Sequence, residues 1–364
     1  MLRPTWIEID LRALSGNVRT VREKVGPDVE LVAVVKSNGF GCGAGKSAIA
    51  ALKGGADAVA VGNPEDAVEI KRNDKEIPVI LYGSTVPESA KEIAETGAIV
   101  TLHDLESLRA FAALDFPVDA YMKVEVGLGR LGIEPEHWDT AFDEIKGSTT
   151  LRLKGIYTHL NAPENRDWID AQMLQYSVAC KKAASYGFDD LTKMVASSHV
   201  MIAHDDLYCD AVNPGRCLFG LLEGPWKEQL DMSPVISRIR SQIIQVKEFS
   251  PGDVVGYLGT SPIDQKKRLA VVPIGFGEGF NHLVPLGEVL VNGARAPAIG
   301  RRGIEHTVID VSDIPSASVG AEVVLLGSQD QDEITPSELS EWLKLPILEL
   351  LPRLARSLPR KYIE

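Results

Sequence analysis

The chain has 364 residues, 45% of them hydrophobic, and a formal net charge of -13 at pH 7. This length allows a large buried core and exceeds one small domain, so two domains are expected, and the acidic balance argues against a nucleic-acid partner. No apolar run approaches the roughly 20 residues needed to span a bilayer, and the N-terminal segment lacks a signal-peptide core, so we expect a soluble cytoplasmic protein without membrane contact.

Strand-like apolar runs alternate with helix-like amphipathic stretches over about the first 225 residues. The expected strands are residues 31–35, 56–61, 77–81, 98–102, 118–124, 153–158, 193–196 and 210–212. The expected helical stretches between them include residues 64–71, 87–95, 105–113 and 167–186. Repeated alternation of this kind predicts a parallel α/β sheet, and eight such units would close a TIM-like barrel.

The pattern changes from about residue 233 onward. Short strand-like segments separated by Gly, Pro and Asp turns predict a mostly antiparallel β domain. These segments are residues 235–246, 268–274, 288–291, 307–311 and 322–326. We therefore expect residues 1–228 to form the barrel and residues 229–364 to form a C-terminal β domain.

The apolar run at residues 31–35 leads directly into Lys36 and a polar turn that holds Gly39, Gly41 and Gly43. Lys36 thus stands at the carboxyl end of a buried strand, where ligands bind in barrels and doubly wound sheets. A lysine in a partly dry pocket loses some of its preference for the charged form, so its amine can act as a Schiff-base nucleophile. The alternative is a strand-end lysine that snorkels to solvent.

Neither a disulfide nor a metal site is expected. The four cysteines, Cys42, Cys180, Cys209 and Cys217, have neither CxxC spacing nor the dense pattern of a secreted domain, so free thiols are predicted. The seven histidines include no HxxxH or HxH pair, which argues against a metal centre.

Seven segments in register resemble the motifs of the alanine racemase family. The first, VVKSNGFGCG at residues 34–43, is similar to the segment whose lysine carries pyridoxal 5'-phosphate (PLP) as an internal aldimine. The others are MKVEVGLGRLGI (122–133), GIYTHL (155–160), VNPGRCLFG (212–220), VVPIGFGEGF (271–280), IGRRGIEHTVIDVSD (299–313) and LPRKY (358–362). The resemblance covers nearly the whole chain. It implies a TIM-like (β/α)8 barrel followed by a mostly antiparallel β domain, a PLP cofactor, a small amino-acid substrate and a homodimer.

The resemblance also implies which residues contact the cofactor. His159 matches a histidine packed against the cofactor ring, and Phe40 stands where the family usually has tyrosine. Arg216 occupies a usually aliphatic position next to the phosphate, where a guanidinium can add a charge-assisted contact or remain at the surface. The full cofactor-binding set so implied is Lys36, Phe40, His159, Ser197, Ser198, Asn213, Gly215 and Arg216.

Two basic residues match family positions near the substrate. Arg130, in GLGRLG, matches an arginine that approaches the phenolic oxygen of the cofactor and the carboxylate of the substrate. Lys123 matches a lysine that is carbamylated in some members and positions that arginine. In the substrate-facing loop, Ile304 and Glu305 replace the usual methionine and aspartate.

Two departures from the family concern the chemistry. In the family, an arginine contacts the pyridine nitrogen of the cofactor and keeps that nitrogen unprotonated. Asn213 stands at this position, and its amide can either accept or donate a hydrogen bond, so the cofactor electronics are expected to differ. Ungapped alignment also puts Ser261 in place of the tyrosine that serves as the second base, and an unassisted serine hydroxyl transfers protons poorly. Other candidates for that role are Tyr257, His199, His282 and His306.

Three functions follow from these matches and departures. The leading hypothesis is a PLP-dependent amino-acid racemase in which Lys36 exchanges the α-proton on one face and a substitute group or water serves the other. The alternative is other PLP chemistry with a single lysine base, as in a lyase, decarboxylase or transaminase, favoured by the loss of the second-base tyrosine. A third hypothesis is a non-catalytic PLP-binding protein, although a carrier would not need the carboxylate clamp Arg130.

Overall fold

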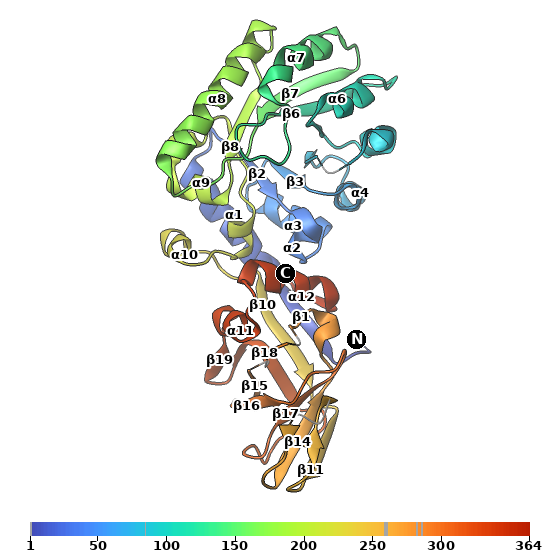
Figure 1. The fold of residues 1–364 in the computed structure, drawn as a ribbon, viewed down its shortest axis with the longest axis vertical. Helices are drawn as coiled ribbons and strands as arrows, with labels where there is room; N and C mark the ends of the chain where they lie inside the picture. The colour runs from blue at the N-terminus through green and yellow to red at the C-terminus, as the bar shows by residue number, and fades with distance from the viewer. Residues whose placement is uncertain (1, 84, 258–260, 282, 285–286) are drawn as a thin grey trace. The chain divides into compact units, whose positions relative to one another are not determined.

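The computed structural model describes residues 2–83, 85–257, 261–281, 283–284 and 287–364 (Figure 1). The chain forms two compact units. The first is Ala13–Ser233, and the second joins the N-terminal segment up to Arg12 with Pro234–Glu364.

A parallel sheet forms the centre of the first unit. Its strands run in the order β4-β3-β2-β9-β8-β7-β6-β5, and a parallel bridge between Ile80 and Ile99 joins the two outer strands, so the described sheet closes on itself. The strands are β2 (Glu30–Val34), β3 (Ala58–Val61), β4 (Val79–Leu81), β5 (Val100–Leu102), β6 (Val118–Lys123), β7 (Leu151–Tyr157), β8 (Thr192–Ala196) and β9 (Ala211–Val212). This arrangement confirms the predicted barrel.

Short apolar and β-branched strands produce this barrel because its inner and outer faces are both covered. The inner cluster consists of Val32, Val34, Ala58, Ala60, Ile80, Tyr121, Tyr157, Met194 and Ala211. Helices lie outside the strands in Figure 1, and α6 and α8 begin with a polar N-cap side chain. Asp104, for example, accepts a hydrogen bond from the backbone N–H of Ser107 at the start of α6, which places that helix directly after β5.

The helices are α1 (Leu11–Val25), α2 (Lys36–Phe40), α3 (Ala44–Lys53), α4 (Pro64–Asn73), α5 (Ala90–Ala94), α6 (Leu105–Ala112), α7 (Trp138–Gly147), α8 (Arg166–Ser185), α9 (Ser198–Ala203), α10 (Pro225–Gln229), α11 (Pro336–Leu343) and α12 (Ile347–Ser357). Short 3₁₀ turns are η1 (Pro87–Ser89), η2 (Pro135–His137), η3 (Asp205–Leu207), η4 (Arg216–Phe219) and η6 (Phe276–Glu278). No helix in the described part of the chain is long and apolar enough to cross a membrane.

The second unit is built on a sheet in the order β11-β14-β17-β16-β15-β18-β10-β1-β20, with β19 paired to β18. Its strands are β1 (Thr5–Asp10), β10 (Ile236–Gln242), β11 (Gln245–Phe249), β14 (Lys267–Val272), β15 (Glu288–Val291), β16 (Ala294–Ile299), β17 (Thr307–Asp310), β18 (Glu322–Gln329), β19 (Asp332–Ile334) and β20 (Arg360–Ile363). A separate ribbon pairs β12 (Val254–Val255) with β13 (Ser261–Pro262). Most pairs are antiparallel, as predicted.

The N-terminal strand belongs to the second unit, whereas the expected division at residue 228 places residues 1–12 with the barrel. β1 pairs antiparallel with β10 and parallel with β20, so Ile7 lies between Ile239 and Arg360. The side chain of Ile7 is fully buried. Burial of this strand between two others explains the difference, because sequence position alone carries no information about long-range pairing.

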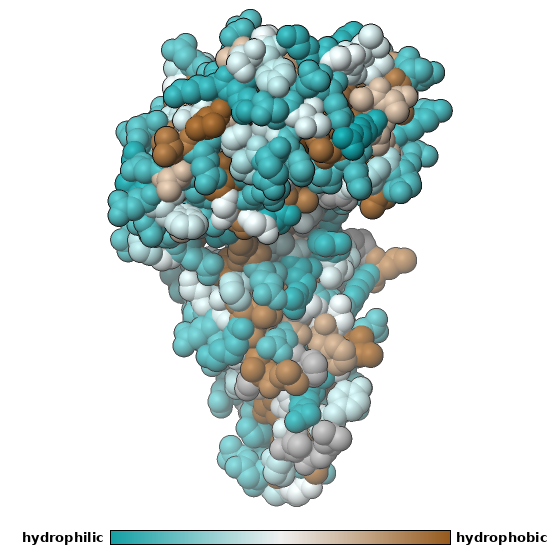
Figure 2. Space-filling view, turned by 45° about the horizontal axis from the view of Figure 1, so that its top comes forward, coloured by the Kyte–Doolittle hydropathy of each residue, from teal (hydrophilic) through white to brown (hydrophobic). Residues whose placement is uncertain are grey.

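Hydrophilic side chains cover most of the face shown in Figure 2, and hydrophobic residues lie there in small separate groups. The four cysteines are free. Over the residues with described positions, no cluster of three or more His, Cys, Asp or Glu side chains could hold a metal ion.

Candidate active site

The strand order of the barrel brings the predicted site residues of the first unit together at one end. β2, β9, β8, β7 and β6 are consecutive neighbours, and Lys36, Asn213, Ser197, His159 and Lys123 lie at or just after their carboxyl ends. Backbone hydrogen bonds join adjacent ends: Val34 N–H donates to Pro214 O at 2.9 Å, and Asn213 N–H donates to Ala196 O at 2.9 Å. This end of a parallel barrel is where chemistry is usually done.

The turn that carries Lys36 has an unusual backbone. Ser37, Asn38, Gly39 and Phe40 have φ values of 55°, 57°, 61° and 50°, so α2 contains four consecutive residues with positive φ. Such a conformation is costly for non-glycine residues and persists only where neighbours hold it. Asp66, buried on α4, accepts a hydrogen bond from Asn38 N–H at 2.9 Å, and Asn38 Oδ1 accepts one from Ala44 N–H at 2.9 Å.

Lys36 lies at the mouth of the barrel with its side chain still exposed. Partial desolvation of the ammonium, followed by the positive charges of Arg130 and Arg216, lowers the pKa of Lys36 below its ordinary value. A larger share of neutral amine is therefore available than in a fully solvated lysine.

Lys123 and His159 lie in the same group of basic residues. Lys123 is only 5% exposed, and desolvation, followed by the charge of Arg130, lowers its pKa to about 8. Desolvation, followed by the charges of Arg130, Lys123, Lys36 and Arg216, lowers the pKa of His159 to about 4. The His159 ring is therefore neutral at pH 7 and can pack against an aromatic ligand without carrying a charge.

Two arginines supply guanidiniums that remain unpaired. Within the described ranges, neither Arg130 nor Arg216 forms an ion pair or a side-chain hydrogen bond, yet each lies near enough to lower the pKa of both Lys36 and His159. Unpaired guanidiniums in such a group are suited to anionic ligands, because their fork of donors matches carboxylate and phosphate oxygens.

The residues predicted to surround a phosphate lie between β8, β9 and the lysine turn. Ser198 Oγ accepts hydrogen bonds from Gly215 N–H at 2.9 Å and from Cys217 N–H at 3.4 Å. A Cβ on Gly215 would lie 3.3 Å from Val34 Cβ and 3.4 Å from Phe40 Cζ, so this turn packs closely on the lysine turn. The Gly215 N–H, an expected phosphate donor, is occupied by Ser198.

Asn213 contains a buried acceptor with no donor. The residue is 6% exposed, and its Nδ2 donates to the Tyr82 hydroxyl at 3.0 Å. Its Oδ1 has no hydrogen-bond partner among the described residues. A buried acceptor without a donor costs free energy unless a ligand supplies one.

Other predicted site residues belong to the second unit. Tyr257 is 64% exposed, Ser261 lies in β13 opposite Val255, and Ile304 O accepts a hydrogen bond from Gly277 N–H at 2.8 Å. A Cβ on Gly303 would lie 3.5 Å from Tyr257 Cε2, so Tyr257 packs beside the loop that holds Ile304.

The histidine candidates are divided between the units. His199, in the first unit, stacks on Trp226 with ring centroids 4.6 Å apart, and desolvation followed by the charge of Arg216 lowers its pKa. His306 follows Ile304 in the second unit, where its carbonyl accepts from Gly303 N–H. His282 lies outside the described residues.

No motif argument singles out Glu125, although the structure places it at the base of the loop that carries Arg130. Its Oε1 accepts hydrogen bonds from the N–H groups of Gly127, Leu128 and Gly129 at 2.5, 2.6 and 3.1 Å. The available signal was a glutamate just after a buried strand and just before a glycine-rich turn, where a carboxylate can cap free N–H groups.

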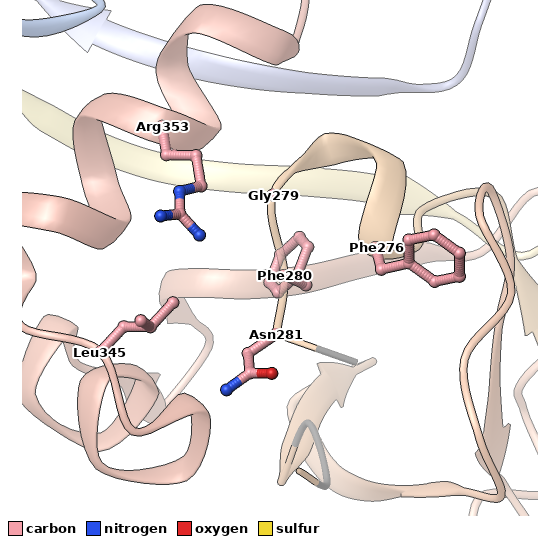
Figure 3. A pocket seen from close by; sticks show the side chains of 6 residues that line it. All are labelled: Phe276, Gly279, Phe280, Asn281, Leu345 and Arg353. Carbon is pink, nitrogen blue, oxygen red and sulfur yellow. The ribbon is translucent and has the colours of Figure 1, made fainter. Parts of the chain in front are cut away.

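The second unit also contains a pocket of about 340 Å³ (Figure 3). It lies between α12 and the segment that follows β14, and it is lined by Phe276, Gly279, Phe280, Asn281, Leu345 and Arg353. None of the barrel residues described above lines it, and Arg353 is already paired with Glu349.

Similarity to known proteins extends over nearly the full length of the chain. Residues 9–223 match the family model "Alanine racemase, N-terminal domain", and residues 236–362 match "Alanine racemase, C-terminal domain". An alanine racemase of Desulforamulus reducens is 29% identical over 373 residues, covering 100% of both chains, and one of Methanococcus maripaludis is 28% identical, covering 99% of both. The crystal structure of alanine racemase from Bacillus anthracis with bound L-Ala-P has a TM-score of 0.91 at 26% identity, covering 100% of this chain and 95% of that one. The chain belongs to the alanine racemase family.

Proposed function

We propose that the protein is a PLP-dependent amino-acid racemase, an isomerase that acts on a small amino acid and carries its cofactor on Lys36. The observation that best supports this is the setting of Lys36. It stands on a strained turn at the carboxyl end of a barrel strand, with a lowered pKa, beside two guanidiniums that have no partner in the described part of the chain. The relatives and solved structures named as alanine racemases support the same reaction.

The residues at the strand ends fit the cofactor. Arg216 and the Ser198 hydroxyl suit a phosphate dianion, since both can donate to its oxygens. The neutral ring of His159 and the buried ring of Phe40 suit an aromatic cofactor. The buried Oδ1 of Asn213 has no donor among the residues that the structure describes, and a protonated ring nitrogen would supply one. In this proposal Ser197 completes the phosphate site, and Gly215 supports it indirectly because its N–H donates to Ser198 Oγ.

The chain then contributes proton transfer and orientation. PLP, when bound, supplies the electron sink that makes the α-proton of an amino acid acidic. Arg130 binds the substrate carboxylate through its guanidinium fork. Lys36 Nζ holds or returns the proton at the substrate Cα on one face, and its lowered pKa keeps part of the amine neutral for that task.

The opposite face requires a second proton carrier. We assign this role to Tyr257 or Ser261, directly or through a bound water, with Ile304 beside the substrate. Tyr257 is the more effective acid–base group of the two, because a phenol gives up its proton more readily than an alkyl hydroxyl. The proposal includes a cytoplasmic homodimer in which these residues come from the partner subunit.

Single-base PLP chemistry is the second candidate function, and the presence of Ser261 at the expected tyrosine position favours it. A lyase, decarboxylase or transaminase would exchange the α-proton from the Lys36 face alone. The product would then keep the configuration of the substrate or lose a substituent.

The deciding experiment uses the full-length protein with PLP and a panel of L- and D-amino acids in deuterated water. NMR follows α-proton exchange, and chiral chromatography follows the enantiomers. Exchange with inversion is the expected result, while exchange with retention would support the single-base alternative. We expect Lys36→Ala to abolish exchange and the visible absorbance of the lysine-bound cofactor.

Lys75→Ala is the matched control, because Lys75 is exposed on the same unit and precedes the amino end of β4, whereas Lys36 follows the carboxyl end of β2. It should keep the wild-type rate. No cofactor absorbance and no exchange with any amino acid would contradict the assignment of a PLP enzyme.

A further inference from the structure

Glu125 lies in a nest of backbone donors. Its side chain is almost completely buried at 8% exposure, and it accepts the three short hydrogen bonds from Gly127, Leu128 and Gly129 at Oε1. Its Oε2 lies 3.4 Å from Arg130 N, which donates to it. Four consecutive N–H groups therefore donate to one carboxylate. Hydrogen bonds to an ionised acceptor are stronger than those to a neutral one.

These bonds outweigh the burial of the carboxylate. Desolvation raises the pKa of Glu125, but the N–H groups of Gly129, Gly127, Leu128 and Arg130 together bring that pKa below its ordinary value. Glu125 is thus ionised in the fold, and a negative charge is the species that the four donors stabilise.

The loop around Glu125 is closed at its base by backbone hydrogen bonds. Glu125 N–H donates to Ile133 O at 3.1 Å, and Ile133 N–H donates to Lys123 O at 2.8 Å. Gly127 and Gly129 have φ values of 112° and 69°, which turn their N–H groups inward. Without the carboxylate the four donors would converge on an empty centre, so the loop conformation depends on Glu125.

Arg130 is the last of the four donors, and its guanidinium has no partner in the described structure to fix its direction. We propose that Glu125 is a positioning residue that fixes the backbone of Arg130 and so aims its guanidinium at the carboxylate of a ligand. The carboxylate part of this inference rests on the proposed function, because Arg130 is the proposed substrate clamp. The dependence of the loop conformation on Glu125 does not rest on the proposed function.

The test measures equilibrium binding of propionate, a simple carboxylate, to the PLP-loaded protein by NMR titration. Hydrogen exchange at the amides of residues 127–130 is measured in parallel. We expect Glu125→Ala to remove the protection of these amides and to weaken propionate binding about tenfold or more, similar to Arg130→Ala. The double variant should bind no more weakly than Arg130→Ala alone, because Glu125 acts through Arg130.

Two further variants guard against a simple folding defect. Glu125→Gln keeps an amide oxygen that can accept the three short bonds, so it should retain most amide protection and an intermediate affinity. Glu136→Gln changes an exposed glutamate of the same connection and should behave as wild type.

Three outcomes would overturn the inference. Unchanged amide protection in Glu125→Ala would show that the loop conformation does not depend on Glu125. Additive losses of propionate affinity in the double variant would show that Glu125 acts independently of Arg130. Absence of propionate binding to the wild type would remove the carboxylate role, while the exchange assay with amino acids judges the proposed reaction separately.

Discussion

At the residue scale, the cationic side chains at the strand ends set one another's protonation. The charge of Arg130 lowers the pKa of Lys36, Lys123 and His159, whereas the charge of Glu125 raises that of Lys123. Binding of anions would relieve this repulsion, because a phosphate and a carboxylate bring negative charge to the two arginines. The charge of this group therefore favours an anionic ligand.

Lys123 gives a pH-dependent prediction. Its pKa is about 8 in the fold and near 10.4 in an unfolded chain, so the unfolded state holds more protons between these values. The cost of burying its charge, no more than about 3 kcal/mol, is fully present below pH 8 and disappears as the pH rises toward 10.4. Between pH 8 and 10.4, the free energy of unfolding of the wild type should therefore rise relative to that of Lys123→Met by up to about 3 kcal/mol.

Denaturant titrations at several pH values in bicarbonate-free buffer measure this difference. A difference that stays constant from pH 7 to 10 would contradict the lowered pKa. Mass spectrometry of the same samples would detect a carbamate on Lys123, which would remove its titration altogether.

The place of the candidate site residue Lys36 follows from the sequence, because the carboxyl end of a parallel strand is determined once the strand is recognised. The candidate role of His159 came from the family resemblance rather than from its position after a strand. Glu125 and the hydrogen bond between Ser198 and Gly215 could not be predicted in this way. They depend on loop conformations, and local sequence does not specify where four N–H groups will converge.

At the element scale, the lysine turn combines local strain with long-range support. Its four positive φ values, from Ser37 to Phe40, oppose the intrinsic preference of three non-glycine residues. The sequence predicts a turn from its glycines but not this left-handed form, because Asp66 comes from the next helix but one and is 28 residues away from Asn38.

We expect Asp66→Ala to loosen this turn. The change removes the acceptor for Asn38 N–H and leaves a partly buried donor unsatisfied, which costs up to about 1–3 kcal/mol. The free energy of unfolding should fall by that amount, and the Asn38 amide should exchange faster with solvent. Glu65→Ala, at the adjacent exposed position of α4, should change neither quantity.

Asp66→Asn retains an acceptor oxygen and should recover most of the lost stability. Equal losses in the Asn and Ala variants would show that the charge, rather than the hydrogen bond, holds the turn.

Elements of the second unit show a different limit of prediction. The sequence pattern of this unit predicted strands and turns, and the structure adds α12, which contains Pro352 although proline is unfavourable inside a helix. Leu350, Leu351 and Leu354 bury one face of this helix. Tertiary packing of that face outweighs the local cost of the proline, which single-sequence propensities do not include.

At the scale of the whole molecule, strands from late in the sequence pair with the N-terminal strand β1. The barrel sequence interrupts the second unit, since β1 precedes it and β10 follows it, and these strands pair with each other. The C-terminal strand β20 then pairs with the other edge of β1. The barrel could be predicted from its repeating strands and helices, whereas this closure joins segments more than 200 residues apart and leaves no local signal.

This closure predicts that a core change in β1 destabilises the second unit. Ile7 is fully buried between β10 and β20, so Ile7→Ala should lower the free energy of unfolding of that unit by about 2–5 kcal/mol. Hydrogen exchange resolved by segment should show faster opening of β10 and β20, with unchanged protection in the barrel strands β2 and β3 if the two units open independently. Leu2→Ala, at a fully exposed position, is the control and should change stability by less than about 0.5 kcal/mol. A loss in Ile7→Ala no larger than in this control would mean that β1 does not support the sheet, and equal acceleration in the barrel strands would mean that the units unfold together.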